Sequence, residues 1–430
     1  MQLAELVVEG LFGKYDHKVL LPTSGEDEAE PSVVILHGPN GVGKTTILRM
    51  LSGMIKLDFN LFRSVPFRRA YIGFNAGQRL TVSRTDDDKA LLIDFDGSSV
   101  LLHPQHGGPF REQDAEAVQE FQQKFRDATE SLTYEYLSAN RIQPGADPDS
   151  PPDAARAAQR TLASIGGVAA NYERLLYQSH LVAEGLKPPE LPSKLAKSVQ
   201  KFIGDAQLDH AAFFRPSEPD LFIKIIDDLA RATAPPMQVD EIRQILGRVQ
   251  QLDAVHIRLG LGTDRWDFDR LMGLLSDKGD ALDEHTLAVL GTYTEFLSSR
   301  STNRQLVAER LLTFEEVMAE FLTGKELRVD ARKGFTIVTE DEHSLDESEL
   351  SSGEYQLLYL MVAALTTRRR GTVIAIDEPE LSMHIAWQRR LVPSLIRCAS
   401  RAAPQLILAT HSPEIAAGYP ESMVELGAQS

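Results

Sequence analysis

This 430-residue chain has a single cysteine, no excess of basic residues and no long apolar run. Its single cysteine, Cys398, excludes an internal disulfide and any metal site built from clustered cysteines. No apolar run reaches the ~18 residues that a membrane-spanning helix needs, so we expect no membrane insertion. The first ten residues include acidic side chains and lack the basic-then-apolar pattern of a signal peptide, and we therefore expect a cytoplasmic protein.

The overall charge is acidic. Lys and Arg number 45 against 62 Asp and Glu, which gives a formal net charge of −17. Proteins that coat nucleic acid present basic surfaces, so this total argues against such a role while leaving a local basic groove open. Hydrophobic residues at 43% and charged residues at 25% are typical of a soluble globular chain.

The chain divides into two β-containing blocks separated by a helical block. Short apolar runs, including VVILH at Val33 to His37 and a meander between Arg69 and His103, predict strands in the first block. A linker rich in Pro and Asp follows at residues 143–152, then helices interrupted by Pro or Gly, and strands return at Lys325. We expect three parts, 1–145, 146–324 and 325–430, with the helical part inserted into the β-containing domain.

One helix near the end of the helical part has a heptad pattern. Mostly apolar residues recur at alternating three- and four-residue spacing from Leu290 to Phe321, and Arg300 and Arg304 interrupt the series. This predicts a helix of about 30 residues, or ~45 Å at 1.5 Å per residue. We expect it to pack within a helical subdomain rather than to form a long exposed coiled coil.

Residues 38–45 read GPNGVGKT and fit the pattern G-x-x-x-x-G-K-[ST], between a strand-like run and a helical run. Such glycines let the backbone wrap closely around phosphate oxygens, while N–H groups and the helix N-terminus supply positive potential. Lys44 is expected to reach the β- and γ-phosphates, and Thr45 to ligate Mg²⁺. The expected nucleotide-binding residues here are Gly38, Asn40, Gly41, Gly43, Lys44, Thr45 and Thr46.

A second apolar run ends in two adjacent carboxylates, within TVIAIDEPE at residues 372–380. In a nucleotide site Asp377 would help to hold Mg²⁺, and Glu378 would orient or deprotonate the attacking water. An acidic pair after a strand is by itself usually a solvated turn. Together with the loop at Lys44, the nucleotide interpretation becomes the stronger one.

Two further segments have both a structural and a functional interpretation. LSSGE at residues 350–354 opens a helical run, where Ser351 is an ordinary N-cap or, alternatively, a γ-phosphate ligand. His411 follows the apolar run LILAT, and a lone histidine is most often structural.

The order of these motifs resembles that of the ABC-type ATPases, and specifically their RecF/SMC/OLD branch. In that family GPNGVGKTT is the Walker A motif, LSSGE the signature motif, VIAIDEPE the Walker B motif and ATHS the histidine switch. The resemblance covers roughly 1–145 and 325–430. It implies an α/β fold: a P-loop core with a parallel sheet, an N-terminal antiparallel β subdomain, and an inserted helical domain.

The resemblance also implies a shared active site in a head-to-tail homodimer, or in a higher oligomer built from such dimers. ATP would lie between Lys44 of one chain and the signature residues Ser351, Ser352, Gly353 and Glu354 of the other. ATP and Mg²⁺ are the implied cofactors, and the implied catalytic residues are Glu378, His411 and Lys44.

Two further residues, Gln78 and Arg141, each have a functional and a structural interpretation. Gln78 is the candidate for a glutamine that contacts the metal, since it follows a strand, and a plain hairpin position is the equal alternative. Arg141 resembles the arginine that follows a strand in OLD-like ATPases, and a surface salt-bridge residue is the equal alternative there.

Several members of this branch carry features that we do not find in this sequence, which reduces the number of subgroups it can resemble. A zinc hook needs a Cys-x-x-Cys in the insertion, but Cys398 is the only cysteine. We expect no Toprim nuclease domain in the 19 residues after His411 and no long SMC-type arm in the insertion. What remains resembles the stand-alone OLD-like ATPase subunits of two-gene antiphage systems, such as the PARIS and Septu types.

That resemblance implies a sensor and scaffold that controls a separate effector, commonly a nuclease, in response to a phage-encoded trigger. The alternative is a RecF-like DNA-repair ATPase that clamps duplex DNA in an ATP-dependent dimer, with the runs Arg68-Arg69 and Arg368 to Arg370 lining its groove. A transporter ATPase subunit and a scaffold with an inactive site are weaker alternatives, because of the insertion and the intact site residues.

Overall fold

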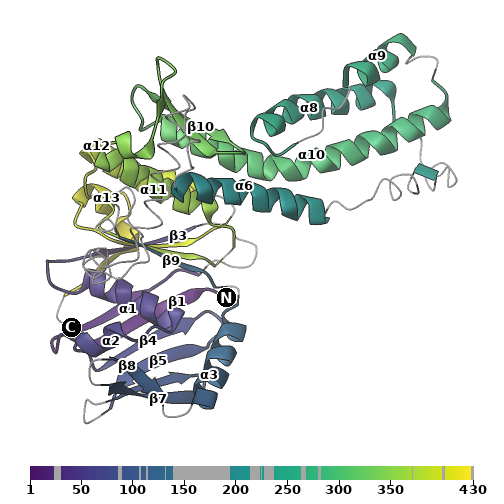
Figure 1. Cartoon of the computed structure of the whole chain (residues 1–430). Coiled ribbons are helices and arrows are strands. Elements are labelled where there is room, and N and C mark those ends of the chain that lie inside the picture. The colour runs from purple at the N-terminus through teal and green to yellow at the C-terminus, as the bar shows by residue number, and fades with distance from the viewer. Residues whose placement is uncertain are drawn as a thin grey trace, which may run out of the picture.

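In a computed structural model of the protein, the described residues form three β-sheets and a projecting group of helices (Figure 1). The structure describes residues 1–23, 31–85, 90–105, 108–112, 115–130, 132–138, 194–213, 223, 225–226, 237–262, 268–278, 282–369, 371–399 and 402–427. Within these residues, no helix is both long enough and apolar enough to cross a membrane.

A five-stranded parallel sheet lies at the centre. Its order is β15 (Met423–Glu425), β3 (Ser32–His37), β14 (Gln405–Ala409), β13 (Val373–Asp377) and β9 (Tyr134–Ser138). β13 and β14 are buried at every position and are apolar except for Asp377 and Gln405 at their ends, as expected for parallel strands that are covered on both faces. All neighbouring strands run the same way, so their carboxyl ends meet at one edge of the sheet.

Alternate residues of these strands belong to two different hydrophobic cores, because successive side chains point to opposite faces. Ile374 and Ile376 of β13 join the core that contains the helices α10 (Glu284–Ala319), α11 (Ser352–Thr366) and α12 (Ile385–Cys398). Val373 and Ala375 join the core shared with α1 (Lys44–Lys56) and the antiparallel sheet. The parallel sheet is therefore the middle layer of the molecule (Figure 1).

The antiparallel sheet comes from the first part of the chain. Its order is β2 (Tyr15–Leu20), β1 (Leu3–Leu11), β4 (Arg69–Phe74), β5 (Arg79–Arg84), β6 (Leu91–Phe95), β7 (Ser98–Gln105) and β8 (Gly108–Glu112). The predicted meander is present, and β2 and β8 are strands that the sequence did not indicate. The short α2 (Leu61–Ser64) and α3 (Ala115–Ala128) accompany it, and Phe95 of β6 meets Phe125 of α3 edge-on at 5.0 Å.

The helices of the middle segment lie between β9 and β10 in the sequence. They are α6 (Lys194–Phe213), α8 (Val239–Arg258), α9 (Phe268–Lys278) and α10 (Glu284–Ala319). The predicted heptad helix is α10, which is 36 residues long. Its first half packs against α8 and α9 through a small core that includes Leu297 and Leu246, and Leu311 and Phe314 in its second half join the main core. The α8–α10 group projects from the sheets (Figure 1).

The C-terminal part completes the upper layer. A three-stranded antiparallel sheet is formed by β10 (Lys325–Asp330), β11 (Gly334–Thr339) and β12 (Ser344–Leu345). The helices α11 (Ser352–Thr366) and α12 (Ile385–Cys398) alternate with the parallel strands, and the short α13 (Pro413–Ala417) follows β14. The predicted α/β fold, with a parallel core sheet, an antiparallel β subdomain and inserted helices, is confirmed.

Candidate nucleotide-binding site

Three strand ends bring the sequence motifs together. The loop with Gly38 follows β3, Asp377 ends β13, and Thr410 and His411 follow β14, all at the carboxyl edge of the parallel sheet. In open α/β sheets, ligands bind in the crevice outside the carboxyl ends of the strands. The topology thus gathers residues that are more than 300 positions apart in the sequence.

The loop backbone depends on glycine at two close contacts. Gly43, the residue before α1, has φ of 100°, and a Cβ there would lie 2.6 Å from Leu11 Cδ2. Gly38 also has a positive φ, and a Cβ there would lie 2.4 Å from the Leu426 carbonyl oxygen. Larger residues would push the loop away from β1 and from the C-terminal segment, so these glycines set the loop's path.

Lys44 is buried under this loop. Its Nζ donates to the carbonyl oxygens of Gly38 at 2.7 Å and Pro39 at 3.1 Å. Burial lowers the pKa of Lys44, while the nearby carboxylates of Glu378, Glu380 and Asp377 act in the opposite direction. A phosphate oxygen is a charge-assisted and therefore stronger acceptor than a neutral carbonyl. A phosphate group bound within the loop would therefore replace the Gly38 and Pro39 carbonyls as the acceptor for the Lys44 ammonium.

Asp377 is held at both carboxylate oxygens. Thr45 Oγ1 donates to Oδ1 at 3.0 Å, and the Tyr136 hydroxyl of β9 donates to Oδ2 at 3.2 Å. The side chain is buried, with 4% of the residue exposed. Burial raises the pKa of Asp377, the Thr45 hydrogen bond lowers it, and the Glu378 charge raises it again. A cation bound beside Asp377 would offset the free-energy cost of burying its charge.

The donor set here fits Mg²⁺. Mg²⁺ prefers hard oxygen ligands and is usually bound by one or two protein groups together with water and substrate phosphates. The Thr45 hydroxyl and the Asp377 carboxylate supply oxygens 3.0 Å apart beside the phosphate loop. Among the described residues, no cluster of three or more His, Cys, Asp or Glu side chains could hold a metal by itself.

Glu378 and His411 follow adjacent strands, and Glu380 connects their segments. Glu378 has an unusual positive φ of 51°, and its N–H donates to the Ala409 carbonyl at 2.8 Å. Glu380 accepts from the His411 N–H at 2.6 Å and from the Thr410 hydroxyl at 2.7 Å. His411 itself is exposed. A non-glycine residue with positive φ costs about 1–3 kcal/mol, which the surrounding contacts must offset.

The signature segment forms the start of α11. Ser351 is the N-cap, and it forms a capping box with Glu354, which also accepts from Lys325 Nζ at 2.8 Å. Gly353 is buried, and a Cβ there would lie 2.4 Å from the Ser382 carbonyl oxygen. Ser352 is exposed. Within the described chain no hydrogen bond or ion pair joins this segment to Lys44 or Thr45, so the structural interpretation of Ser351 is the one seen in a single subunit.

Of the two interpretations of Gln78, the hairpin position is the one seen in the structure. Gln78 lies in the turn between β4 and β5, where its carbonyl accepts from the Phe74 N–H. Phe74 pairs with Leu3, whose backbone bonds the side chain of Gln405 at the amino end of β14. The sequence shows that Gln78 follows a strand. It does not show which sheet that strand belongs to, or at which edge of the sheet the strand ends. Arg141 lies outside the described residues.

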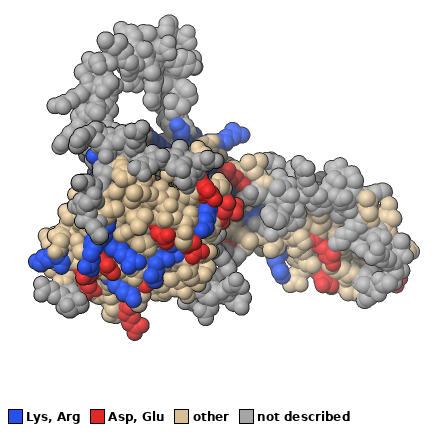
Figure 2. All heavy atoms as spheres, turned by 90° about the horizontal axis from the view of Figure 1, so that it is seen from below, with Lys and Arg blue, Asp and Glu red and all other residues tan. Residues whose placement is uncertain are grey.

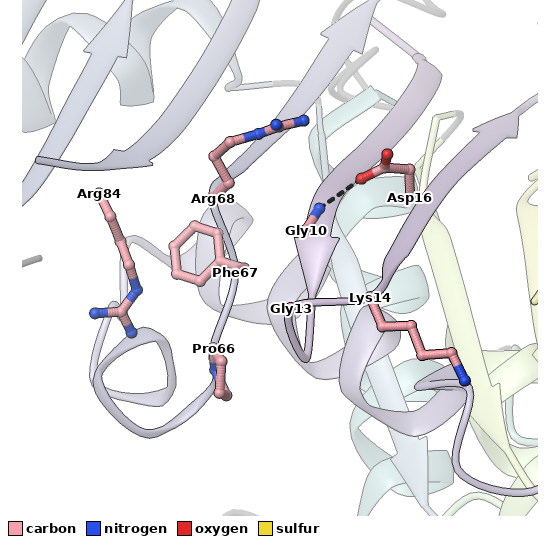
Figure 3. A pocket seen from close by; sticks show the side chains of 8 residues that line it. All are labelled: Gly10, Gly13, Lys14, Asp16, Pro66, Phe67, Arg68 and Arg84. Carbon is pink, nitrogen blue, oxygen red and sulfur yellow. Dashed lines mark hydrogen bonds between the residues drawn. The ribbon is translucent and has the colours of Figure 1, made fainter. Parts of the chain in front are cut away.

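A pocket of about 450 Å³ lies between the β1–β2 turn and the segment that precedes β4. Leu11, the last residue of β1, leads into this turn. Its side chain lies close to Gly43 of the phosphate loop. Figure 3 shows Phe67 between Arg84 and this turn, and the Arg84 guanidinium lies 5.2 Å from the centre of the Phe67 ring. The lining residues are Gly10, Gly13, Lys14, Asp16, Pro66, Phe67, Arg68 and Arg84.

Sequence reasoning did not identify Tyr136 or Glu380 as site residues, and it did not predict this pocket. The available signal was the alternation in YEYLS, since Tyr134 and Tyr136 must share one side of a strand. Which element that side faces follows only from the position of β9 beside β13.

The comparison with protein families decides the class of this site. Residues 134–417, about two thirds of the chain, match the family described as "AAA domain, putative AbiEii toxin, Type IV TA system". The chain belongs to this family. It is therefore an AAA/ABC-type ATPase domain, and the matched range includes β9, the signature segment, Asp377 and His411.

Other likenesses of this AAA-family chain are partial or distant. It is 33% identical over 67 residues to the cytochrome c biogenesis ATP-binding export protein CcmA of Paracoccus denitrificans. That match covers 16% of this chain and 32% of CcmA, so the chain spans about a third of its relative.

Two solved Smc head domains match this chain over most of its length at low identity and low TM-score. One, from Pyrococcus furiosus and bound to the C-terminal domain of ScpA, has 12% identity, covers 97% of this chain and 91% of its own, and has a TM-score of 0.38. Another, from Pyrococcus yayanosii, has 13% identity, 97% and 93% coverage, and a TM-score of 0.39.

Proposed function

We propose that this chain binds Mg²⁺ and ATP at the phosphate loop and hydrolyses ATP to ADP and phosphate. The convergence of Lys44, Thr45 and Asp377 at one strand edge carries this proposal. Mg²⁺, when bound, neutralises charge on the phosphates. Glu378, next to Asp377 and on a strained backbone, is the base that orients water. In this proposal the base and ribose bind in the pocket lined by Lys14, Phe67 and Arg68.

The site is completed by a second copy of the chain in this proposal. Ser351 and Ser352 are exposed at the start of α11, where the helix N-terminus favours an anion. In a head-to-tail dimer they would face the γ-phosphate held by Lys44 of the partner copy. ATP would then favour the closed dimer because it contacts both copies, and hydrolysis would release it.

The proposed biological role is that of a sensor and scaffold that controls a separate effector, a nuclease, in antiphage defence. Support comes from the family description, which names a toxin and a type IV toxin–antitoxin system. The projecting α8–α10 group and the acidic net charge of −17 suit a protein partner better than a nucleic acid.

The decisive experiment compares wild-type protein with Glu378→Gln and Lys44→Ala. Glu378→Gln should bind ATP with wild-type affinity but hydrolyse it at least about 100-fold more slowly, since proton transfer contributes roughly 10²–10⁴-fold. Lys44→Ala should lose nucleotide affinity. Normal turnover by Glu378→Gln would refute the assignment of the base.

The role in defence is tested separately in cells that carry the gene with its neighbours. Both variants should restore phage sensitivity, and the purified wild-type chain should bind a protein encoded beside its gene. Unchanged phage resistance together with no bound neighbour would refute the sensor role without affecting the ATPase assignment.

The structure gives less support to a DNA clamp. On the side of the antiparallel sheet, Lys and Arg side chains are mixed with Asp and Glu (Figure 2). Arg68 pairs with Glu9 at 3.5 Å, and Arg368 pairs with Asp205 at 3.6 Å. Arg68 and Arg368 are thus each engaged by a carboxylate of the same chain. Salt-dependent duplex binding in the presence of ATP would favour the clamp instead.

A further inference from the structure

We propose that Tyr136 is a positioning residue for the Mg²⁺ site. Its hydroxyl fixes the Asp377 carboxylate so that Oδ1 faces Thr45 and the phosphate loop. The inference rests on the proposed function, because it assigns a role in the same site, and it names a residue outside the P-loop and the acidic motif.

The geometry makes the contact specific. Tyr136 lies on β9, in parallel register with Ala375, two residues before Asp377 on β13. Its hydroxyl reaches the carboxyl end of the neighbouring strand and donates to Asp377 Oδ2 at 3.2 Å. Thr45 occupies Oδ1 from the other side at 3.0 Å. The two donors therefore determine the rotation of the carboxylate plane.

Removing the tyrosine hydroxyl would leave Oδ2 without this donor in a nearly closed environment, since Asp377 is 4% exposed. A buried acceptor that loses its partner reorients toward another donor or toward water. The carboxylate would then present its oxygens less well to a metal beside Thr45. Outer partners of metal ligands act in this way, and their loss typically costs about 10- to 100-fold in metal affinity or activity.

The chain provides a matched control two residues away. Tyr134 is on the same strand and on the same side as Tyr136. Its hydroxyl donates to the Leu48 carbonyl of α1 at 3.1 Å, so it holds the helix that follows the phosphate loop. Tyr134→Phe and Tyr136→Phe thus remove the same atom from the same strand, but only one of these atoms contacts Asp377.

The experiment measures binding of a fluorescent ATP analogue to full-length wild type, Tyr136→Phe and Tyr134→Phe, first in EDTA and then with increasing Mg²⁺. Tyr136→Phe should keep its affinity in EDTA within about twofold, and should need about tenfold more Mg²⁺ for half of the metal-dependent gain. Tyr134→Phe should need the wild-type Mg²⁺ concentration. Mn²⁺ binding, followed by electron paramagnetic resonance, should show the same ranking, and thermal unfolding shows that both variants are folded.

Equal Mg²⁺ requirements for wild type and Tyr136→Phe would overturn the inference and leave the proposed ATPase standing. An equal shift in both variants would also overturn it, because the effect would then come from β9 rather than from the hydroxyl on Asp377. Wild-type protein that binds no nucleotide would overturn the proposed function, and this inference with it.

Discussion

The charged form of the Asp377 carboxyl group is less favourable in the folded protein than in water. Asp377 is buried and close to Glu378 and Glu380, and burial is the main reason why its pKa is raised. Two hydroxyl donors offset part of this cost. A residue kept in an unfavourable place by its neighbours is typical of a binding site that a cation completes.

Replacing Asp377 by Asn should therefore stabilise the fold. A carboxyl whose folded pKa is raised contributes a penalty that is fully present above the folded pKa and vanishes as pH falls through the unfolded value. We expect Asp377→Asn to increase the free energy of unfolding by about 0.5–2 kcal/mol at neutral pH. The gain should shrink on acidification, and denaturant-induced unfolding at several pH values measures it.

Asp341→Asn is the control for this substitution, since Asp341 lies in an exposed turn. It should change stability little at any of these pH values. A lower stability of Asp377→Asn at neutral pH would show that the hydrogen bonds outweigh the burial cost and that the sign argued above is wrong.

At the scale of elements, α11 is built to begin sharply at Ser351. The Ser351 hydroxyl and the Glu354 carboxylate satisfy backbone groups at the helix start, and Lys325 of β10 anchors the carboxylate. At the other end, Arg310 of α10 donates to the Thr367 carbonyl at 2.6 Å and lies over Phe202 of α6. The helix that carries the signature segment is thus tied to the projecting helices at its C-terminal end.

Ser351→Ala should destabilise the protein by about 0.5–2 kcal/mol, because the N-cap hydrogen bond is lost. Ser352→Ala is the matched control, since Ser352 is exposed in the first turn, where alanine is a good helix former. Thermal unfolding of nucleotide-free protein should separate the two variants. Equal midpoints would contradict the capping role of Ser351.

At the scale of the whole molecule, the strand order places the Walker-type residues at one edge, while the signature segment engages neighbours of its own subunit. Gly353 contacts the loop at Ser382, and Gln356 donates to the Pro379 carbonyl at 3.0 Å. This arrangement leaves Ser351 and Ser352 exposed for a second copy of the chain, as the proposed dimer requires.

Mixing two inactive variants should therefore restore activity. Lys44→Ala lacks the phosphate-loop cation, and Ser351→Arg blocks the signature surface. A mixed dimer would contain one intact site, made from Lys44 of one chain and Ser351 of the other. ATPase activity should appear on mixing, up to about a quarter of the wild-type rate for random pairing. A mixture that stays as inactive as its components would refute the shared site.

Part of this architecture could be predicted from local pattern alone. VVILH and TVIAID are buried strands because they are continuous apolar runs, and α10 follows its heptad spacing. Glycines at positions 38 and 43 were expected where the loop wraps tightly. Gln78 could not be placed, because hairpin turns and site loops have similar composition and differ only in which sheet edge they reach.

The sequence by itself determined the P-loop, the acidic pair, the buried strands β3 and β13, the heptad helix α10 and the family resemblance, since these depend on neighbouring residues and on fixed spacing. Only the tertiary structure decided that Tyr136 and Thr45 share Asp377, that Glu380 joins the His411 segment, and that a pocket lies beside Lys14. These contacts join strands from distant parts of the chain. Their partners are chosen by strand order and packing, which no short stretch of sequence encodes.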